Sequence, residues 1–290
     1  GCSQGNSGDD AATGSVAIPV GLERFLLFPN PIVDTSGNFQ TNTNAFAQAY
    51  YDAVDPDRER GTLAAWKMKN QFGTGGDEFV AVFRDVRDLG YGRRMTGRRN
   101  SLDGSIAFFV ENYNVSRVPG SYSQINVDAA VVRDSTWHVG INAIEWSPAR
   151  CKPTDPPDCD SSVSFAKYFN FDPVTGQRQN MLDLDGRGQK AMPGICVNCH
   201  GGRADPLTPL STFALVENSL SRKRGDMQGR LQPFNVDSFE WSTTRGFTRA
   251  DQEATLKIVN QWGLCSYPGG GSVTGNGGTC NRPAAGANEW

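Results

Sequence analysis

Five consecutive residues, Cys196-Val197-Asn198-Cys199-His200, carry the strongest chemical signal in this chain of 290 residues. The spacing C-x-x-C-H is the attachment signature of a c-type haem. Each thiol can form a thioether with one haem vinyl group, and the adjacent histidine is the usual proximal ligand of the iron. We therefore expect one covalent haem c, bound through Cys196 and Cys199, with His200 on the iron.

Two other uses of these cysteines fit the chain less well. A structural zinc site needs four ligands with suitable pair spacing. The chain has one further histidine, His138, and no second C-x-x-C pair. A thioredoxin-like dithiol needs a βαβ context, whereas this motif lies between two glycine-containing segments. Haem attachment is the reading that the residues favour.

The ligand on the other side of the iron decides what such a haem does. A methionine raises the reduction potential and favours electron transfer, whereas an open position lets a small molecule bind. Met95 directly follows Arg93 and Arg94, in a segment with two glycines that allow close backbone approach. The two arginines are suited to pair with haem propionates. Met95 is our first choice for the distal ligand, and Met227, His138 and an open site are the alternatives.

The other cysteines indicate an oxidising compartment. Cys151 and Cys159 flank a proline-rich loop, and Cys265 and Cys280 flank a glycine-rich segment. Local pairing within each set is the simplest arrangement, and it predicts two disulfides. Structural disulfides are typical of exported proteins.

Cys2 has a different expected role. It is followed by a polar, glycine-rich segment, as at the mature start of a bacterial lipoprotein. We expect a lipid on Cys2, a signal peptide already removed, and a location in the periplasm, in the outer membrane or at the cell surface. The alternative is an incidental free thiol.

Composition excludes some classes of partner. The formal net charge is −3, so no global positive field points to nucleic acid. The sequence has no run of 18 apolar residues, which a transmembrane helix would need.

The order of helix-like and strand-like segments predicts an α+β fold. It has an antiparallel β-rich middle, flanking helices and a C-terminal haem-binding region of helix and loop. We expect a flexible tether over 1–20, a helix-then-β region over 21–160 and a haem-binding region over 161–290 with a C-terminal helix and a disulfide-closed loop. One compact unit formed by 21–160 and 161–290 together is the alternative. Apolar spacing and helix stops predict helices over 44–54 and 63–72. A capping box at Thr248 predicts another helix that ends near Gly263. Strand-like segments cover 78–84, 105–113, 126–134, 138–146 and 163–171, with a hairpin turn over 171–176.

The segment 165–202 combines a strand, an FD-x-x-x-G turn, an LD-x-x-G turn and M-P-x-x-C-x-x-C-H-G-G. Together with 88–95, it resembles a group of large exported bacterial monohaem cytochromes of lipoprotein type that carries no assigned reaction. A looser similarity links the chain to cytochrome P460 and the β-type cytochromes c′, in which a mostly antiparallel fold precedes the haem motif. That similarity implies an open distal face, and P460 proteins also cross-link a lysine to the haem. Lys167 and Lys190 precede the motif here.

These observations predict a carrier of single electrons more than a catalyst. Its partners would be redox proteins, including a larger membrane-associated redox assembly, and the membrane itself through Cys2. A P460-like haem enzyme or gas-binding protein with an open distal site is the alternative function. A structural or assembly subunit of a redox complex is a further alternative.

Overall fold

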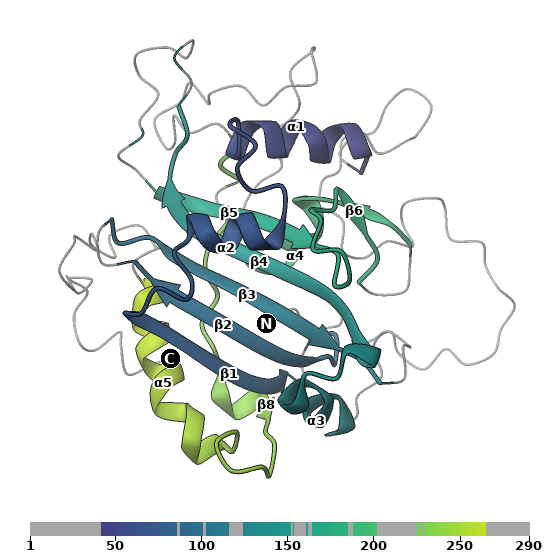
Figure 1. Ribbon diagram of the computed structural model, residues 1–290, viewed down its shortest axis with the longest axis vertical. Coiled ribbons are helices and arrows are strands. Elements are labelled where there is room, and N and C mark those ends of the chain that lie inside the picture. The colour runs from purple at the N-terminus through teal and green to yellow at the C-terminus, as the bar shows by residue number, and fades with distance from the viewer. Residues whose placement is uncertain are drawn as a thin grey trace, which may run out of the picture.

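The computed structural model describes residues 42–264, apart from 86–87, 101–102, 116–123, 152, 154–160, 162–163, 185–187, 202–224 and 228. Its centre is a six-stranded antiparallel sheet in the order β5-β4-β3-β2-β1-β8 (Figure 1). The strands are β1 (Asp77–Asp85), β2 (Gly92–Arg99), β3 (Ile106–Tyr113), β4 (His138–Pro148), β5 (Ser164–Phe171) and β8 (Phe239–Glu240). This architecture confirms the predicted α+β class with an antiparallel β-rich middle.

Five helices accompany the sheet in the described part of the chain. They are α1 (Asn44–Val54), α2 (Leu63–Lys69), α3 (Gln124–Val132), α4 (Gly194–His200) and α5 (Arg249–Leu264). Two 3-10 turns, Ser135–Trp137 and Val236–Ser238, precede β4 and β8. A small second sheet pairs β6 (Met181–Leu182) with β7 (Lys190–Ala191). None of the helices within these described ranges is long and apolar enough to cross a membrane.

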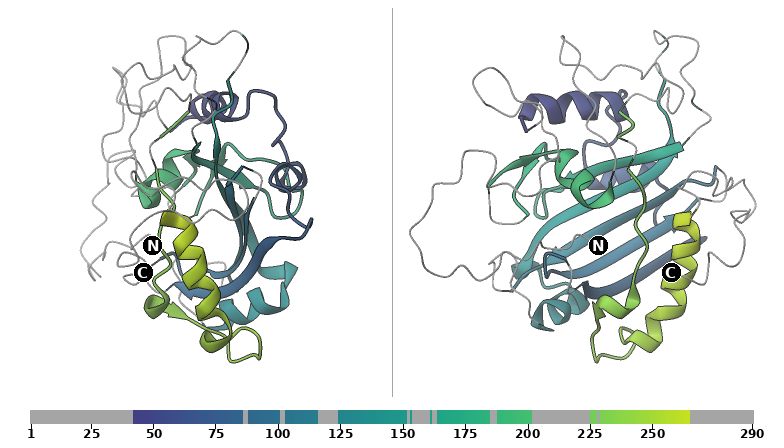
Figure 2. Two further views of the ribbon diagram at one scale, coloured as in Figure 1. Left: turned by 90° about the vertical axis from the view of Figure 1, so that its left-hand side faces the viewer. Right: turned by 180° about the vertical axis from the view of Figure 1, so that it is seen from behind.

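The two faces of the large sheet are covered by different helices (Figure 2). Side chains alternate between the faces along each strand. On one face, Phe83 of β1 and Phe108 of β3 pack with Val259 of α5; α4 lies over this same side of the sheet. We call this the site face. On the reverse face, Val82 of β1 packs with Val127 of α3, and α2 covers the neighbouring strands.

The local signals that begin and end helices are confirmed where they are strongest. The hydroxyl of Thr43 accepts a hydrogen bond from the Phe46 amide at 3.0 Å, and α1 spans the predicted 44–54. In the capping box of α5, the Thr248 amide donates to the Asp251 carboxylate at 3.1 Å and the Asp251 amide donates to the Thr248 hydroxyl at 3.3 Å. The turn after β5 closes through a 2.9 Å hydrogen bond from the Gly176 amide to the Asp172 carbonyl.

One predicted element differs from the structure, and one strand was not predicted. The strand predicted over 126–134 is wrong, because these residues form most of α3 and the turn after it. The segment around Met95, for which no element was predicted, is strand β2. Its arginines and glycines weaken any strand signal, but β1 and β3 hydrogen-bond to it on both sides. Strands β5 and β8 belong to the predicted haem-binding region, so that region and 21–160 share one sheet. The predicted tether over 1–20 lies outside the described residues.

Candidate functional site

A pocket lies between the site face of the sheet and the segment that carries α4, the chain after it and α5. Its empty volume is about 1230 Å³, including its opening to solvent. Alternate residues of five neighbouring strands form the floor: Phe83, Arg93, Met95, Phe108, Val110, Asn112, Asn142, Ile144 and Tyr168. Most of this floor is apolar and one end is polar, as an amphipathic cofactor requires.

The predicted haem motif forms one wall of this pocket. Cys196, Cys199 and His200 all line it, together with Ile195 of the same short helix. His200 is the last residue of α4, and the next residue, Gly201, has φ of 66°. That left-handed conformation suits glycine and lets the chain leave the helix directly after the histidine. The sequence motif and the floor of the sheet therefore meet in one place.

His200 is held by the backbone of a distant residue. Its Nδ1 atom lies 2.9 Å from the carbonyl oxygen of Arg230, and the Arg230 amide donates to the His200 carbonyl at 3.0 Å. A carbonyl oxygen can only accept a hydrogen bond, so Nδ1 carries the proton and Nε2 keeps its lone pair. Burial lowers the pKa of His200 below its ordinary value, which also favours the neutral imidazole. A neutral histidine with a free Nε2 and a hydrogen-bonded Nδ1 is the form that ligates a metal.

The chain after Arg230 forms a wall that is fixed at both ends. One end is the pair of hydrogen bonds with His200. At the other end, the Phe234 amide donates to the Asn260 side chain at 2.7 Å, and the Asn260 amide group donates to the Phe234 carbonyl at 3.0 Å. Leu231 and Phe234 of this wall line the pocket. The stretch from Arg230 to Phe234 is thus hydrogen-bonded to both α4 and α5.

The two cysteines of the motif differ in this structure. Cys196 is a free thiol, with its Sγ 3.8 Å from the Sδ of Met192. Burial raises the pKa of this thiol to about 12, so it is protonated at neutral pH. Cys199 is disulfide-bonded, and no described residue is its partner. A sulfur in a disulfide cannot form a thioether, so haem attachment requires that this bond be reduced first.

The other cysteine predictions fall mainly outside the described residues. Cys151 is disulfide-bonded, as the pairing with Cys159 requires. Cys159, Cys265, Cys280 and the predicted lipid site Cys2 all lie outside the described ranges.

Met95 lies in the same pocket as His200. It sits in the middle of β2, paired with Ala81 on β1 and Val110 on β3, and it is 2% exposed. It packs in the cluster of site-face side chains that includes Phe83 and Phe239. Among the described residues that line this pocket, Met95 is the one methionine and His200 the one histidine.

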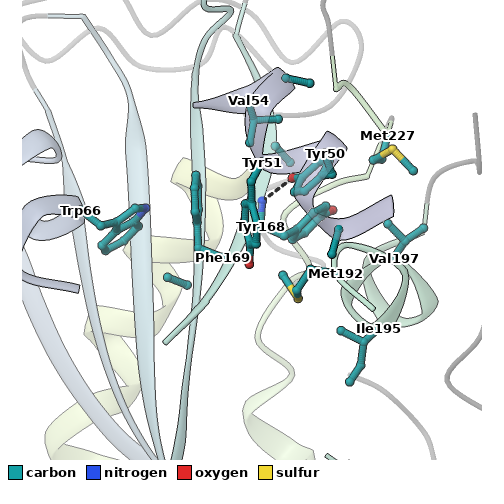
Figure 3. Close-up of a cluster of buried hydrophobic side chains, with 14 of the residues drawn as sticks. Tyr50, Tyr51, Val54, Trp66, Tyr168, Phe169, Met192, Ile195, Val197 and Met227 are labelled. Atoms are coloured by element: carbon teal, nitrogen blue, oxygen red, sulfur yellow. Dashed lines mark hydrogen bonds between the residues drawn. The ribbon is translucent and has the colours of Figure 1, made fainter. Parts of the chain in front are cut away.

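The two alternative ligands lie elsewhere. Met227 is fully buried in the cluster that contains Tyr50 and Val197 (Figure 3), and it does not line the pocket. His138 begins β4 and stacks on Tyr113 with ring centroids 5.0 Å apart, also away from the pocket. The geometry therefore favours Met95 over both.

The two arginines before Met95 face opposite sides of the sheet. Arg93 lines the pocket and pairs with Asp88 at 2.5 Å. Arg94 faces the reverse side, where its guanidinium lies 5.7 Å from the ring centre of Phe247. It borders a separate depression there and not the pocket. Of the two predicted propionate contacts, only Arg93 is placed for that role.

The lysines that invited comparison with P460 proteins are not among the residues that line the pocket. Lys167 is fully buried, and its Nζ donates to Ser147 Oγ and to the Pro148 carbonyl, both at 2.6 Å. Lys190 belongs to β7, and its Nζ donates to the Gly188 carbonyl at 3.2 Å.

The structure also adds pocket residues that we did not anticipate. Asn112 and Asn142 form part of its polar end, and Asp88 is buried there beside Arg93. No spacing rule connects these residues, because strand pairing and the fold of the loop before β2 bring them together.

The fold and the site define an α+β protein with a pocket whose donor set fits a covalently bound haem. Comparison with known proteins found no matching family model, no matching curated protein and no matching solved structure. A function for this protein is therefore inferred from its own residues.

Proposed function

We propose that the protein is a monohaem c-type cytochrome that carries single electrons. One observation supports this most: Cys196, Cys199, His200 and Met95 line the same pocket, although Met95 is about a hundred positions away in sequence. The covalent anchors, the proximal ligand and the distal ligand of a low-spin haem would all be supplied by this arrangement.

Attachment to the chain would use the two cysteines. Each S–H group adds across one vinyl C=C bond: the sulfur bonds to one carbon, the hydrogen to the other, and the π bond is lost. No oxidant or leaving group is needed for this addition. Cys199 must first be reduced, by exchange with a dithiol reductant that itself becomes a disulfide and leaves Cys199 and its former partner as thiols.

The haem would supply a one-electron ferric–ferrous couple, and the protein would fix its surroundings. Arg230 holds His200 through Nδ1, so the proximal ring has one orientation. Met95 projects from the centre of a sheet that is hydrogen-bonded on both sides. Two ligands on rigid elements keep the iron geometry similar in both oxidation states, which favours electron transfer over substrate binding.

The place of the protein in the cell is part of the same proposal. A c-type haem and a disulfide at Cys151 suit an exported bacterial protein. Its partners would be redox proteins at the membrane, including a larger redox assembly. A lipid on Cys2 would keep the protein close to them.

The direct test is production of the chain in a bacterium that carries a haem c maturation system, followed by intact-mass analysis under denaturing conditions. We expect the mass of the chain plus one haem, which acid and organic solvent do not extract. A chain without covalent haem, from cells that mature a known cytochrome c in parallel, would overturn the proposal.

A further inference from the structure

A row of polar side chains crosses the site face at one end of the pocket. Arg93 on β2 is paired with Asn112 on β3, and Asn142 on β4 is paired with Asn170 on β5. Arg93, Asn112 and Asn142 line the pocket. Asn112 and Asn142 are diagonal neighbours, because Asn112 is paired with Gly140 and Asn142 with Val110. Four adjacent strands thus contribute one polar residue each near one end of a largely apolar floor.

One backbone carbonyl fixes the direction of the whole row. The Asn112 Nδ2 atom donates to the carbonyl of Gly140 at 3.2 Å, which can only accept. The same amide group donates to Asn142 Oδ1 at 3.2 Å. The Asn170 Nδ2 atom donates to that same oxygen at 3.1 Å. Asn142 must therefore present its oxygen to both neighbours, since the reverse orientation would place two donors against a third.

This orientation leaves the amide donors of Asn142 for the pocket. Within the described part of the chain, Asn142 Nδ2 donates no hydrogen bond. The residue is half-buried in the pocket lining, so a ligand there that exposes acceptor oxygens would pair with it. Beside it, Arg93 adds a positive charge. The ion pair with Asp88 uses one terminal nitrogen of the guanidinium group.

Apolar side chains make up most of the remaining lining, although Asp85, Tyr168, His200 and Gln232 also belong to it. Met95, Phe108, Phe239 and Val259 lie toward β1 and α5. A haem has one apolar macrocycle and two carboxylate side chains on one edge. A haem in this pocket would therefore match the lining in one orientation, with its two carboxylates facing Arg93, Asn112 and Asn142.

We propose that Asn142 and Arg93 bind a haem propionate, with Asn112 and Asn170 as positioning residues that set the direction of the Asn142 amide. This inference rests on the proposed haem. It adds which edge of the haem faces which strands, and it assigns a role to three asparagines on β3, β4 and β5.

The test uses the haem-loaded protein and the propionate bending band in its resonance Raman spectrum, which moves to lower frequency when a propionate loses hydrogen bonds. Asn142→Leu removes the amide at similar volume, and we expect a downshift of this band. Asn142→Asp keeps the shape but places a carboxylate beside the propionate; we expect the same downshift and a lower midpoint potential. Asn180→Leu, at a hydrogen-bonded site beside α1, is the control and should leave the band unchanged.

The possible results separate this inference from the proposed function. If the wild-type protein contains haem but the propionate band has the same frequency in wild type and in Asn142→Leu, this inference is overturned and the proposed function is not. A wild-type protein without covalent haem would overturn both.

Discussion

The Nδ1 atom of His200 lies 2.9 Å from the carbonyl oxygen of Arg230, and the reciprocal backbone hydrogen bond measures 3.0 Å. This relationship links the end of α4 to the chain that leads to α5. It leaves Nε2 as the nitrogen available to a metal in the pocket. The motif at 196–200 therefore occurs with the second hydrogen bond that an iron-ligating histidine normally makes.

The two cysteines of the motif should each account for one covalent bond. We predict that Cys196→Ala and Cys199→Ala each leave a haem with one thioether, seen as a displaced α band in the pyridine haemochrome spectrum. The double variant should lose covalent haem altogether, as measured by intact mass. Free thiols should be absent at both positions in the loaded wild type after reduction and alkylation. Alkylation of Cys199 in that protein would contradict its assignment.

The buried carboxylate Glu145 should be essential for stability. It is fully buried, 3.1 Å from Arg60 Nε and 2.8 Å from Asn70 Nδ2. Burial alone would raise its pKa, but the positive charges of Arg60 and Lys167 and the hydrogen bonds around it lower the pKa to about 2. Glu145→Gln removes the closer of the two carboxylates paired with Arg60, the other being Asp55 at 3.6 Å, and it also removes the negative charge beside Lys167. We expect a loss of about 3 kcal/mol in the free energy of unfolding.

The pH dependence of stability gives this prediction a sign. A carboxyl group whose folded pKa lies below its ordinary value of 4.5 stabilises the fold above that pH and loses this contribution as pH falls toward 2. We therefore expect the free energy of unfolding, measured with denaturant, to decrease more steeply between pH 4.5 and pH 2 for wild type than for Glu145→Gln. Glu59→Gln, in a half-exposed pair with Lys69, is the control and should change stability far less than Glu145→Gln. Equal effects of the two substitutions would contradict the account.

Lys167 should also make stability rise with pH, but over a higher pH range. Burial lowers its pKa to about 7, although Glu145 at 3.9 Å opposes the shift. Between pH 7 and the ordinary pKa of 10.5, the unfolded chain binds more protons at this residue, so wild-type stability rises with pH. Lys167→Met removes this term. We therefore expect its stability relative to wild type to be higher at pH 6 than at pH 9, and a constant difference across this range would contradict the shift.

Two glycines of the sheet should respond differently to a methyl group. A Cβ at Gly92 would lie 1.7 Å from the carbonyl oxygen of Asn126, because α3 packs directly on the start of β2. A Cβ at Gly140 would have no neighbour within 4 Å. We predict that Gly92→Ala lowers the free energy of unfolding by about 3 kcal/mol or more, whereas Gly140→Ala stays close to wild type. Similar melting temperatures for the two variants would show that α3 does not approach β2 this closely.

The elements predicted well from sequence are those with local signals at their ends. Thr43 marks the start of α1, and the Thr248–Asp251 box marks α5; both act through hydrogen bonds within one helical turn. By contrast, α3 contains the alternating apolar residues of a strand. Its burial of Val127 and Ala130 at helical spacing becomes clear only when the helix packs on β1 and β2. Strand β2 was missed because its polar sequence is stabilised by neighbours on both sides.

The same distinction applies to the site. The C-x-x-C-H motif could be recognised from the sequence because it is compact. Met95 could be selected because it is an apolar residue in a polar segment, and it lines the same pocket as the motif. The opposite directions of Arg93 and Arg94 follow from the alternation of strand β2, which was not predicted. The asparagines of β3, β4 and β5 come together only through strand register, which no local pattern contains.

His200 and Met95 are the proposed iron ligands, and substitution of two methionines tests this assignment. The matched variants are Met95→Leu and Met227→Leu, since both methionines are almost fully buried but only Met95 lines the pocket. We expect Met95→Leu to become high-spin and to bind carbon monoxide in the ferrous state, and Met227→Leu to keep the wild-type spectrum.

The most direct measurement is the visible and near-infrared absorption spectrum of the haem-loaded wild-type protein. We predict a low-spin haem, the weak near-infrared band of methionine bound to ferric iron, and no reaction of the ferrous protein with carbon monoxide. A high-spin ferrous haem that binds carbon monoxide, with no methionine band, would contradict the electron-carrier proposal and favour an open distal site.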